Sequence, residues 1–441
     1  MPLILFEDEY WRRFSAIVQA RPVFELRCGA FTARERVAAF TAHTPLGLAR
    51  PHLMGVFGPE QGYAGLLAAS EPVTLVNGRL LDVTWLAQLQ AAPLNTVYLA
   101  GDSLLGAQLS PALASAVLYY LQRQQSEAAR DELRRFARVV EYGDDAPPLL
   151  LGFPWDMIAQ AGEQLVRDLP LLQQRLPPLS DEPPGVTTRG ERIYVSPDAR
   201  LDGPIVLDAR DGPIYIEANA HIEPFSFIQG PAYIGAGTLV ASARIRAETS
   251  LGPVCRVGGE IEASIMQGYS NKHHDGFLGH SWLGEWVNIG AMTTNSDLKN
   301  NYGSIRVVLE GMGQHDSGLI KLGCFLADHV KLGIGLHMNG GTIIGTGSNV
   351  FGVHTAPKTI PHFTWGGEVF REYRIDSMIG VARTVMGRRK RTLTSQYEAL
   401  LRAAFEISRN SRGELIEAPP SPVVIADERA LARAEAEAMR A

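Results

Sequence analysis

The sequence predicts two structural units in tandem, an α/β domain followed by a parallel β-helix, with a helical tail after them. Strand-like apolar runs alternate with helical patterns over residues 1–176, a proline-rich stretch follows, and from residue 216 onward apolar side chains recur every six positions. A chain of 441 residues is also longer than one ordinary core accommodates. We therefore divide it into an α/β domain (1–176), a linker (177–185), a β-helix (186–367) and a helical C-terminal tail (368–441).

Three short runs in the first unit have the pattern of strands: LILF (3–6), VTLVNG (73–78) and TVYLAGD (96–102). A helix is predicted over 110–140, where serine followed by proline supplies a cap and a good first helical residue. A second helix is predicted from Trp155 to about Leu172. Strands separated by helices predict a parallel sheet. The stretch PPLSDEPPG (177–185) then has four prolines and two acids in nine residues, which is typical of a linker.

The second unit is recognised by its six-residue period. Fourteen apolar positions follow this spacing in three tracts: Ile216, Ile222, Ile228, Ile234 and Val240; Phe277, Leu283 and Ile289; Ile320, Leu326, Leu332, Met338, Ile344 and Val350. A parallel β-helix explains the period, because each hexapeptide forms one short strand and a turn, and successive coils rise by ~4.8 Å. A glycine-rich antiparallel β-domain is the alternative, and so many positions in phase disfavour it.

The period breaks between Ala291 and Leu319, where a polar segment is predicted to leave the β-helix as a loop and to offer a place for a site. Beyond residue 367 the sequence becomes helix-like and contains a basic run at 388–391. This run is either a solvated helix face or a phosphate-binding site for a nucleotide or coenzyme A. A linker (416–424) and a short terminal helix are predicted after it.

Composition excludes several classes of function. The formal net charge of −6 gives no indication of binding to nucleic acid or to an anionic membrane. No window approaches the ~20 apolar residues of a membrane helix, and the N-terminus lacks the pattern of a signal peptide. Cys28, Cys255 and Cys324 form neither a disulfide framework nor a zinc spacing, which favours a reducing cytoplasm.

The stretch GYSNKHHDGFLGHSWLGEWVNIG (268–290) holds the densest group of proton-transferring side chains. His273, His274 and His280 lie within eight residues, with Lys272 and Asp275 beside them. Imidazole takes up a proton near neutral pH, so a histidine here is a candidate general base. A histidine in a repeat can also be purely structural, but the repeat phase and the adjoining loop favour a site.

This stretch and two others resemble a known family. RPVFELRCGAFTARER (21–36), FPWDMI (153–158) and above all residues 268–303 are similar to the GlmU-like sugar nucleotidyltransferases. That branch is related to the bifunctional enzyme that acetylates glucosamine 1-phosphate and uridylylates the product. The resemblance implies a nucleotidyltransferase-like (Rossmann-like) first domain, a left-handed β-helix of hexapeptide repeats, acetyl-CoA as acyl donor and a homotrimer.

The resemblance also implies roles for individual residues. His274 matches the acetyltransferase base, which in the family precedes an LG and VNIGA run, whereas His273 and His280 match it less well. Arg246 and Asn288 match substrate-binding residues, and Ala291 lies in the segment expected along the coenzyme.

Further substrate contacts are expected around this base. Asn301 and Tyr302 resemble a substrate-binding turn, and Lys272 and Asp275 can orient the imidazole ring or the substrate. The family's paired lysines before the histidine are missing, because residues 260–270 are acidic here. The phosphate of an acceptor sugar is therefore held differently, or the acceptor is another sugar.

The first domain departs further from the family pattern. Its first strand runs into Glu7, Asp8 and Glu9 with no G-x-G-T-R loop, and the expected metal-binding Gly-Asp appears as Asn77-Gly78-Arg79. If this domain binds a nucleoside triphosphate with Mg²⁺, positive charge and a metal ligand have to come from elsewhere. The candidates are Arg21, Arg27, Arg34 and Asp102.

Three functions remain open from the sequence. The first is acetyl transfer from acetyl-CoA to an amino sugar that is phosphorylated or nucleotide-linked, in nucleotide-sugar biosynthesis. The second is sugar-1-phosphate nucleotidyl transfer, with the β-helix as a trimerising scaffold. The third is a catalytically degenerate platform that binds nucleotide sugars, because fold alone does not determine function.

Overall fold

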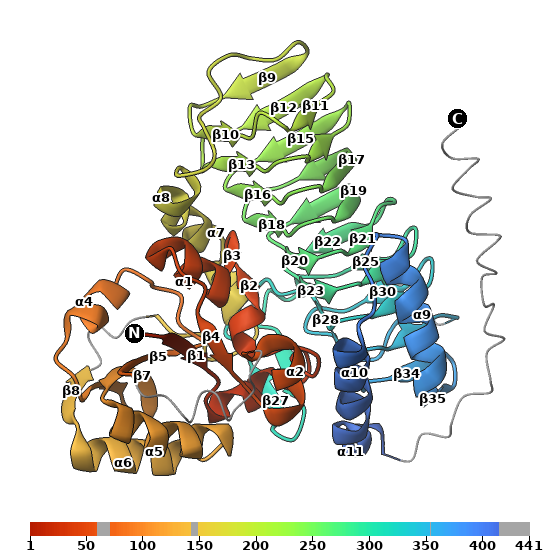
Figure 1. Ribbon diagram of the computed structural model, residues 1–441. Helices are drawn as coiled ribbons and strands as arrows, with labels where there is room; N and C mark the ends of the chain where they lie inside the picture. The colour runs from red at the N-terminus through yellow and green to blue at the C-terminus, as the bar shows by residue number, and fades with distance from the viewer. Residues whose placement is uncertain (60–70, 143–148, 353, 414–441) are drawn as a thin grey trace.

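The computed structural model describes residues 1–59, 71–142, 149–352 and 354–413. Figure 1 shows an α/β domain beside a long stack of short strands, with helices α9, α10 and α11 along the C-terminal end of the stack. The predicted order of an α/β domain, a β-helix and a helical region is confirmed. The terminal linker and helix predicted after residue 413 lie outside the described residues.

The α/β domain is built on a sheet with the strand order β4-β1-β5-β7-β6-β8. Its strands are β1 (Leu3–Phe6), β4 (Leu46–Leu48), β5 (Val73–Asn77), β6 (Thr96–Ala100), β7 (Ser103–Leu109) and β8 (Arg138–Tyr142). Strand β1 is parallel to β4 and β5, but β7 is antiparallel to both β5 and β6. The prediction of a parallel sheet was therefore wrong in part, because the tight turn between β6 and β7 forms a hairpin that no helix interrupts.

Helices and short turns surround this sheet (Figure 1). Its shorter elements are η1 (Glu9–Phe14), η2 (Val23–Glu25), β2 (Arg27–Cys28), β3 (Phe31–Thr32), α1 (Ala33–Thr41), η3 (Pro51–Leu53), α2 (Met54–Phe57) and α4 (Leu86–Ala91). The helix predicted over 110–140 is two helices, α5 (Pro111–Gln122) and α6 (Ser126–Phe136), followed by β8. Gln124 has a left-handed φ of +59°, which ends α5. The helix predicted from Trp155 is α7 (Asp156–Arg167) with the short α8 (Leu169–Leu172).

The second domain is a parallel β-helix whose coils stack strand on strand in register. One face consists of β10 (Ile193–Val195), β13 (Ile214–Ile216), β16 (Ala232–Ile234), β18 (Thr249–Leu251), β20 (Ile265–Gly268), β23 (Trp282–Glu285), β28 (Phe325–Leu326), β31 (Ile343–Ile344) and β33 (Thr359–Ile360). Another sheet runs through β9 (Val186–Arg189), β12 (Ile205–Asp208), β15 (Ser226–Gln229), β17 (Leu239–Ile245), β19 (Arg256–Glu262), β21 (Asn271–Lys272), β24 (Asn288–Ile289), β29 (Lys331–Leu332), β32 (Asn349–Val350), β34 (Thr364–Gly366) and β35 (Phe370–Glu372). Strands β11 (Arg200–Leu201), β14 (His221–Ile222) and β22 (Phe277–Gly279) join it at the side, and β25 (Thr294–Asn295) pairs with β30 (His337–Met338).

The six-residue period correctly identified the core of the β-helix, with two exceptions. Twelve of the fourteen predicted positions are buried in one continuous apolar cluster. Phe277 is only half-buried, because its neighbour Leu278 points inward instead, and Ile320 is 52% exposed. Ile320 lies at the end of the segment that leaves the coil, just before the chain returns at Leu322.

The predicted loop begins after β25 and returns at Leu322. It contains an antiparallel hairpin, β26 (Arg306–Leu309) and β27 (Gly313–Asp316), whose residues Ile305, Val307 and Leu309 are buried against the β-helix and the first domain. The loop is thus a packed element that closes one side of the molecule.

The segment 21–29 docks the first domain onto the β-helix. The guanidinium of Arg21 donates to both carboxylate oxygens of Asp328 at 2.8 Å, and lies 3.3 Å from the carboxylate of Glu285. Backbone and side chain of Arg27 donate to Gln267, and the Ser250 hydroxyl donates to the carbonyl of Gly29 at 2.7 Å. Most of these groups are buried. The two domains therefore meet through defined hydrogen bonds in a closely packed interface.

The C-terminal helices complete the junction. Helices α9 (Ile375–Gly387) and α10 (Ser395–Ile407) contribute Met378, Leu400 and Phe405 to the apolar core of the first domain, and the short α11 (Arg409–Arg412) follows them. Helix α10 contacts α2 and η3. Within the described residues, no helix is both long and apolar enough to cross a membrane.

Candidate functional site

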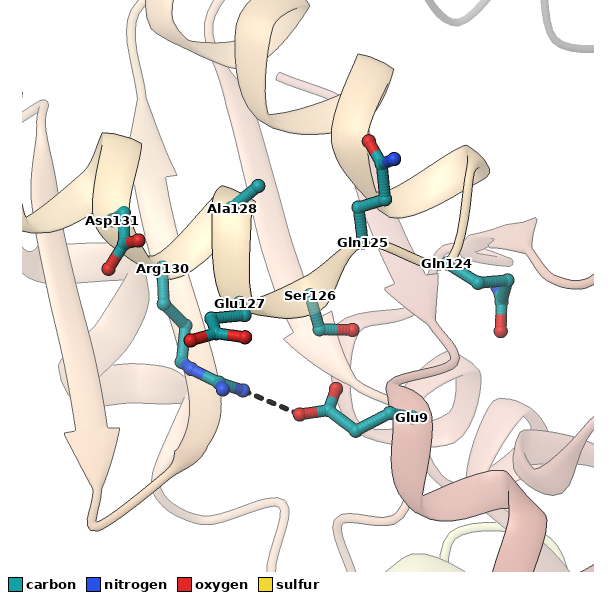
Figure 2. Close-up of a pocket in the computed structure, with 8 residues that line it drawn as sticks. All are labelled: Glu9, Gln124, Gln125, Ser126, Glu127, Ala128, Arg130 and Asp131. Carbon is teal, nitrogen blue, oxygen red and sulfur yellow. Dashed lines mark hydrogen bonds and ion pairs between the residues drawn. The ribbon is translucent and has the colours of Figure 1, made fainter.

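The carboxyl edge of the first sheet, where an α/β domain usually binds its ligand, is filled by ion pairs. The three consecutive acids after β1 each meet a different arginine. Glu7 lies 3.2 Å from Arg50, Asp8 lies 2.6 Å from Arg79, and Glu9 lies 2.7 Å from Arg130. Figure 2 shows the Glu9–Arg130 pair at the rim of a shallow hollow beside the first turn of α6.

Asp8 is paired with the residues that stand at the expected metal-binding position. Arg79 donates to it from Nε and Nη2, and the amide of Asn77 donates to Oδ2 at 2.8 Å. Asp8, Asn77 and Arg79 are all buried. The residues that replace the expected metal-binding Gly-Asp therefore neutralise the one carboxylate that could have bound Mg²⁺, and this edge does not fit a metal-bound triphosphate. In the described residues, no group of three or more His, Cys, Asp or Glu side chains is placed to hold a metal ion.

The structure does not bring the predicted nucleotide-binding residues together. Arg21 and Arg27 lie buried in the domain interface, and Arg34 pairs with Glu25 at 2.6 Å. Burial lowers the pKa of Arg21, but the charges of Asp328 and Glu285 outweigh it and raise the pKa well above its ordinary value. Asp102 is exposed in the turn between β6 and β7. The three arginines were predicted to bind a nucleotide because their segment resembles a phosphate-binding one. In the structure this segment docks the first domain onto the β-helix.

A different cavity remains in the first domain, between α1, α7 and the segment after β5. It has a volume of about 680 Å³, and Arg36, Phe40, Asp82 and Gln164 are among its lining residues. Arg36 is held by Asp168 at 2.8 Å, with Nη1 left without a partner. The cavity offers both polar and aromatic contacts.

His274 lies at a corner of the β-helix, between β21 and β22. Its ring is exposed, contacts the ring of His273 edge-on at 5.1 Å between centroids, and accepts or donates no hydrogen bond within the described chain. Below it, the buried ammonium of Lys272 donates to the carbonyl of His274 at 2.6 Å and to that of Gly258 at 2.9 Å. Lys272 therefore positions the backbone of His274 and is not free to contact a substrate as predicted.

The corner beneath His274 is tightly built. Gly259 has a left-handed φ of +71°, and a Cβ there would lie 2.9 Å from Nζ of Lys272. Burial lowers the pKa of Lys272 to about 8, although the charge of Asp275 opposes the shift. Asp275 itself is exposed, and its carbonyl accepts from the amide of Met292 at 2.8 Å.

Asn288 lies on the face that leads to this corner. Its side chain accepts from the amide of Asn271 at 2.7 Å, and the strands place Arg256, Asn271, Asn288 and Lys331 in one column, one coil apart. Burial lowers the pKa of Lys331 to about 7, so a lysine with a substantial neutral fraction lies beside Asn288. The sequence did not suggest Lys331, because only the register of β24 and β29 brings it there.

Arg246 lies elsewhere, in a groove of about 290 Å³ that also includes His280, Glu262 and Lys321. Arg246 is 3.7 Å from Glu260, and Lys321 is 3.1 Å from Glu262. The predicted substrate arginine thus accompanies His280 and not His274.

His280 is more buried than His274, and its ring is held by a hydrogen-bonding partner. Its Nδ1 lies 2.7 Å from Oδ2 of Asp297, and both side chains are largely buried. If Nδ1–H donates to the carboxylate, this pairing leaves Nε2 of His280 unengaged. Burial raises the pKa of Asp297, but the hydrogen bond and charge of His280 outweigh it, so that pKa lies below its ordinary value. This pairing could not be inferred from the sequence, because Asp297 belongs to the segment that leaves the repeat.

The remaining predicted residues lie in the loop and on the coil of Asn288. Asn301 and Tyr302 lie exposed in a turn of the loop, where Asn301 caps the amide of Gly303 at 3.1 Å. Ala291 is half-buried beside Gly335, whose amide donates to its carbonyl at 2.9 Å. The structure places Ala291 on the coil of Asn288, whereas Asn301 and Tyr302 belong to the loop that leaves the β-helix.

Comparisons with known proteins agree with this architecture. Residues 3–176 match the family model described as sugar nucleotidyl transferase. A curated relative, the bifunctional protein GlmU of Acidithiobacillus ferrooxidans, is 29% identical over 199 residues, which cover 41% of each chain. GlmU of Methylibium petroleiphilum is 32% identical over 163 residues, covering 35% of this chain and 32% of its own. The chain thus spans about two fifths or less of the length of these relatives.

Two solved structures are similar to part of the chain. AntD, an N-acyltransferase from Bacillus cereus in complex with dTDP-4-amino-4,6-dideoxyglucose and coenzyme A, is 17% identical over 46% of this chain and 92% of its own, with a TM-score of 0.20. The UDP-N-acetylglucosamine acyltransferase of Francisella novicida is 10% identical over 57% of this chain and 98% of its own, with a TM-score of 0.23.

The fold defines the class, a nucleotidyltransferase-like α/β domain joined to a hexapeptide-repeat β-helix. Over part of its length the chain is similar to a sugar nucleotidyl transferase domain and to curated GlmU proteins.

Proposed function

We propose that the protein is a transferase that moves an acetyl group from acetyl-CoA to the amine of an amino sugar, phosphorylated or nucleotide-linked, at the histidine corner of its β-helix. The observation that supports this most directly is the placement of His274. Its ring is exposed and unengaged at a rigid corner, while Lys272 fixes its backbone from below. A general base needs both a free imidazole and a fixed position.

The chemistry is that of acyl transfer. The amine nitrogen attacks the thioester carbonyl, the carbon–sulfur bond breaks, and coenzyme A leaves as the thiolate. The proton that the amine loses passes to the imidazole of His274, while Asn288 and Asn271 can hold hydroxyl groups of the sugar on the adjoining face. Ala291, on the same coil, is where we expect the coenzyme to pass.

His280 is the competing base for the same reaction. Its carboxylate partner, its neighbour Arg246 and its groove all suit the deprotonation of an amine. Against it, the ion pairs of Arg246 and Lys321 already engage the cations of the groove. The competition is resolved by substituting each histidine alone.

We propose further that the protein works as a homotrimer. Met292 and Ile334 lie 64% and 80% exposed on the coils next to the His274 corner. Exposed apolar side chains next to a candidate site are typical of a surface that a partner covers. A second copy packed here would enclose His274 and complete the site, which would explain why its ring has no partner within one chain.

The experiment is an acetyl-transfer assay in which thiol release from acetyl-CoA is followed with a panel of amino sugars and their 1-phosphates and nucleotide derivatives. We expect acceptor-dependent release by the wild type and its loss in His274→Ala. Release that is equally fast without any acceptor, or none with every acceptor tried, would contradict the proposal. Sedimentation of the same protein tests the trimer.

A second function, nucleotide-sugar binding without nucleotidyl transfer, is favoured for the first domain by one observation. Its usual ligand edge is closed by the Asp8–Arg79 pair, whereas the cavity at Arg36 and Gln164 remains open. We expect calorimetry to show binding of a nucleotide sugar that Arg36→Ala weakens, with no release of pyrophosphate from any nucleoside triphosphate. Mg²⁺-dependent pyrophosphate release would instead support sugar-1-phosphate nucleotidyl transfer by the first domain.

A further inference from the structure

A group of five cations lies where the last turn of α9 meets the β-helix. We call Arg256, Arg388, Arg389, Lys390 and Arg391 the basic cluster. Four of them form the turn after α9, which is fixed by hydrogen bonds from the amides of Arg389 and Arg391 to the carbonyl of Met386, at 2.9 and 3.0 Å. Lys390 has a left-handed φ of +55°. The fifth, Arg256, begins strand β19.

The turn is attached to the β-helix next to the candidate site. Arg391 donates to the hydroxyl of Tyr269 at 2.6 Å and lies over its ring at 5.4 Å. Tyr269 in turn stacks on Trp286 at 4.6 Å, and Trp286 is buried. Tyr269 lies two residues before Asn271 in the sequence. Its contacts therefore hold the basic turn against the face that carries Asn288.

Arg256 connects the cluster with that face. Strand register places Arg256 beside Asn271, and Asn271 beside Asn288, so Arg256 lies two coils from Asn288, or roughly 10 Å at the usual strand spacing. Arg389 is close enough to Arg256 and Arg388 to be affected by them. Burial lowers the pKa of Arg389, and the charges of these two neighbours lower it further.

Between residues 1 and 413, apart from the stretches the structure leaves undescribed, no carboxylate forms an ion pair with any of the five. The rest of the molecule behaves differently. Buried arginines such as Arg21, Arg36 and Arg79 each have a carboxylate, and Arg383 on α9 itself pairs with Glu398 at 2.8 Å. Single exposed arginines need no partner, because water solvates them, but five gathered cations repel one another. The dipole of α9 favours cations at its end, but it does not account for Arg256, which belongs to the β-helix.

We propose that the basic cluster binds the phosphate group of a phosphorylated acceptor sugar. The inference rests on the proposed acetyl transfer. It names the residues that would bind the acceptor's phosphate, a binding site that the histidine corner lacks. The segment before His274 supplies Glu260 and Glu262 where the resemblance implied lysines, so positive charge for a phosphate has to come from outside the repeat. The cluster supplies it on the side of Asn271 and Asn288. Arginine is well suited to this task, since its fork of N–H donors matches phosphate oxygens.

The test uses the double variant Arg388→Gln/Arg389→Gln and the single variant Arg256→Gln, with Arg383→Gln as a control on the same helix. Steady-state acetyl transfer is measured with an amino sugar and with its 1-phosphate. We expect KM for the phosphorylated acceptor to rise roughly ten- to hundredfold, the range for losing hydrogen bonds to a charged group. We expect KM for the unphosphorylated sugar, kcat and the control to change little.

Two kinetic outcomes would overturn the inference. Equal KM values for the phosphorylated sugar in variants and wild type would show that the cluster does not contact it. A rise in KM for acetyl-CoA, absent with dephospho-coenzyme A as the carrier, would assign the cluster to the coenzyme's phosphate instead.

A binding measurement separates this inference from the proposed function. If no acceptor is acetylated, calorimetry with glucosamine 1-phosphate and with inorganic phosphate still compares wild type and double variant. Binding to the wild type at one site per chain, weakened in the double variant and by added salt but not in Arg383→Gln, supports the cluster as a phosphate site even without turnover. Equal binding to both proteins, or none to either, refutes it.

Discussion

The carboxyl edge of the first sheet and the His274 corner of the β-helix are both places where their folds usually hold a ligand. Within the described residues, their charged groups are paired in the first and unpaired in the second. At the sheet edge Glu7, Asp8 and Glu9 are each paired with an arginine. At the corner, the ring of His274 forms no hydrogen bond with the part of the chain that the structure describes, and no carboxylate in that part pairs with the nearby basic cluster. Charges that are already paired leave little to offer a ligand, whereas exposed groups that are solvated only by water can exchange that water for a ligand. The comparison agrees with a structural role for the first edge and with the chemistry that we propose for the second.

The largest expected effect distinguishes the two histidines. His274→Ala should lower kcat for acetyl transfer roughly 10²–10⁴-fold, the usual contribution of a general base, while His280→Ala keeps most of the activity. Steady-state thiol release measures both variants against the wild type. If His280→Ala and Asp297→Asn lose kcat and His274→Ala does not, the base is in the Arg246 groove, and the acetyltransferase proposal stands with a different residue.

The next largest effect concerns the closed edge of the sheet. Arg79→Met leaves Asp8 buried without its charge partner, which should lower the free energy of unfolding by ~3–5 kcal/mol. Denaturant unfolding measures the loss, and replacing Asp8 by Asn as well should recover part of it. Arg134→Met, which breaks the exposed pair with Glu141, is the control and should cost ~1 kcal/mol or less. If the two variants cost the same, Asp8 is not held as the geometry indicates.

How far the sequence predicted the molecule depended on whether the signal was local. Strands β1, β5 and β6 and the β-helix core follow from short-range patterns, and these were correctly predicted. The break at Gln124 was missed, because a left-handed residue that is not glycine leaves no mark in an otherwise helical pattern.

The site was predictable only in the same local sense. His274 is found by its distance from VNIGA, along one stretch of chain. The role of Arg21 could not be inferred, because its partner Asp328 is 307 residues away and only the docking of two domains brings them together. Similarly, Asp297 reaches His280 by folding back from a loop. A role inferred from the resemblance of a whole segment therefore does not hold where tertiary contacts give that segment a structural role.

A pH dependence follows from the buried ammonium beneath His274. The pKa of Lys272 is lowered to about 8 in the folded protein, against ~10.4 in the unfolded chain. Between these values the unfolded chain binds one proton more, so stability rises with pH across this window, by up to ~1.4 kcal/mol per pH unit from this group. Below pH 8 both states are protonated and the cost of burying the charge is fully present.

Removing the ammonium tests that window. Lys272→Met should flatten the slope of stability against pH between about 8 and about 10.4, as measured by denaturant unfolding at each pH. Lys321→Met, at the exposed ion pair with Glu262, is the matched control and should leave the slope unchanged. An unaltered slope in Lys272→Met would mean that the ammonium is better solvated than its burial indicates.

The smallest effect comes from a second histidine–carboxylate pair on the β-helix. Nε2 of His221 lies 2.9 Å from Asp202, a separation close to that of His280 and Asp297, but both side chains are about one third exposed. His221→Ala should change the free energy of unfolding by ~1 kcal/mol or less and leave acetyl transfer unaltered, because exposed pairs contribute little. The same substitution at His280 removes a pair that also secures the loop at Asp297, so a larger loss of stability is expected there. If His280→Ala is as mild as His221→Ala in stability but changes the pH profile of transfer, then Asp297 orients a reacting histidine; if it changes stability alone, the pair serves to hold the loop.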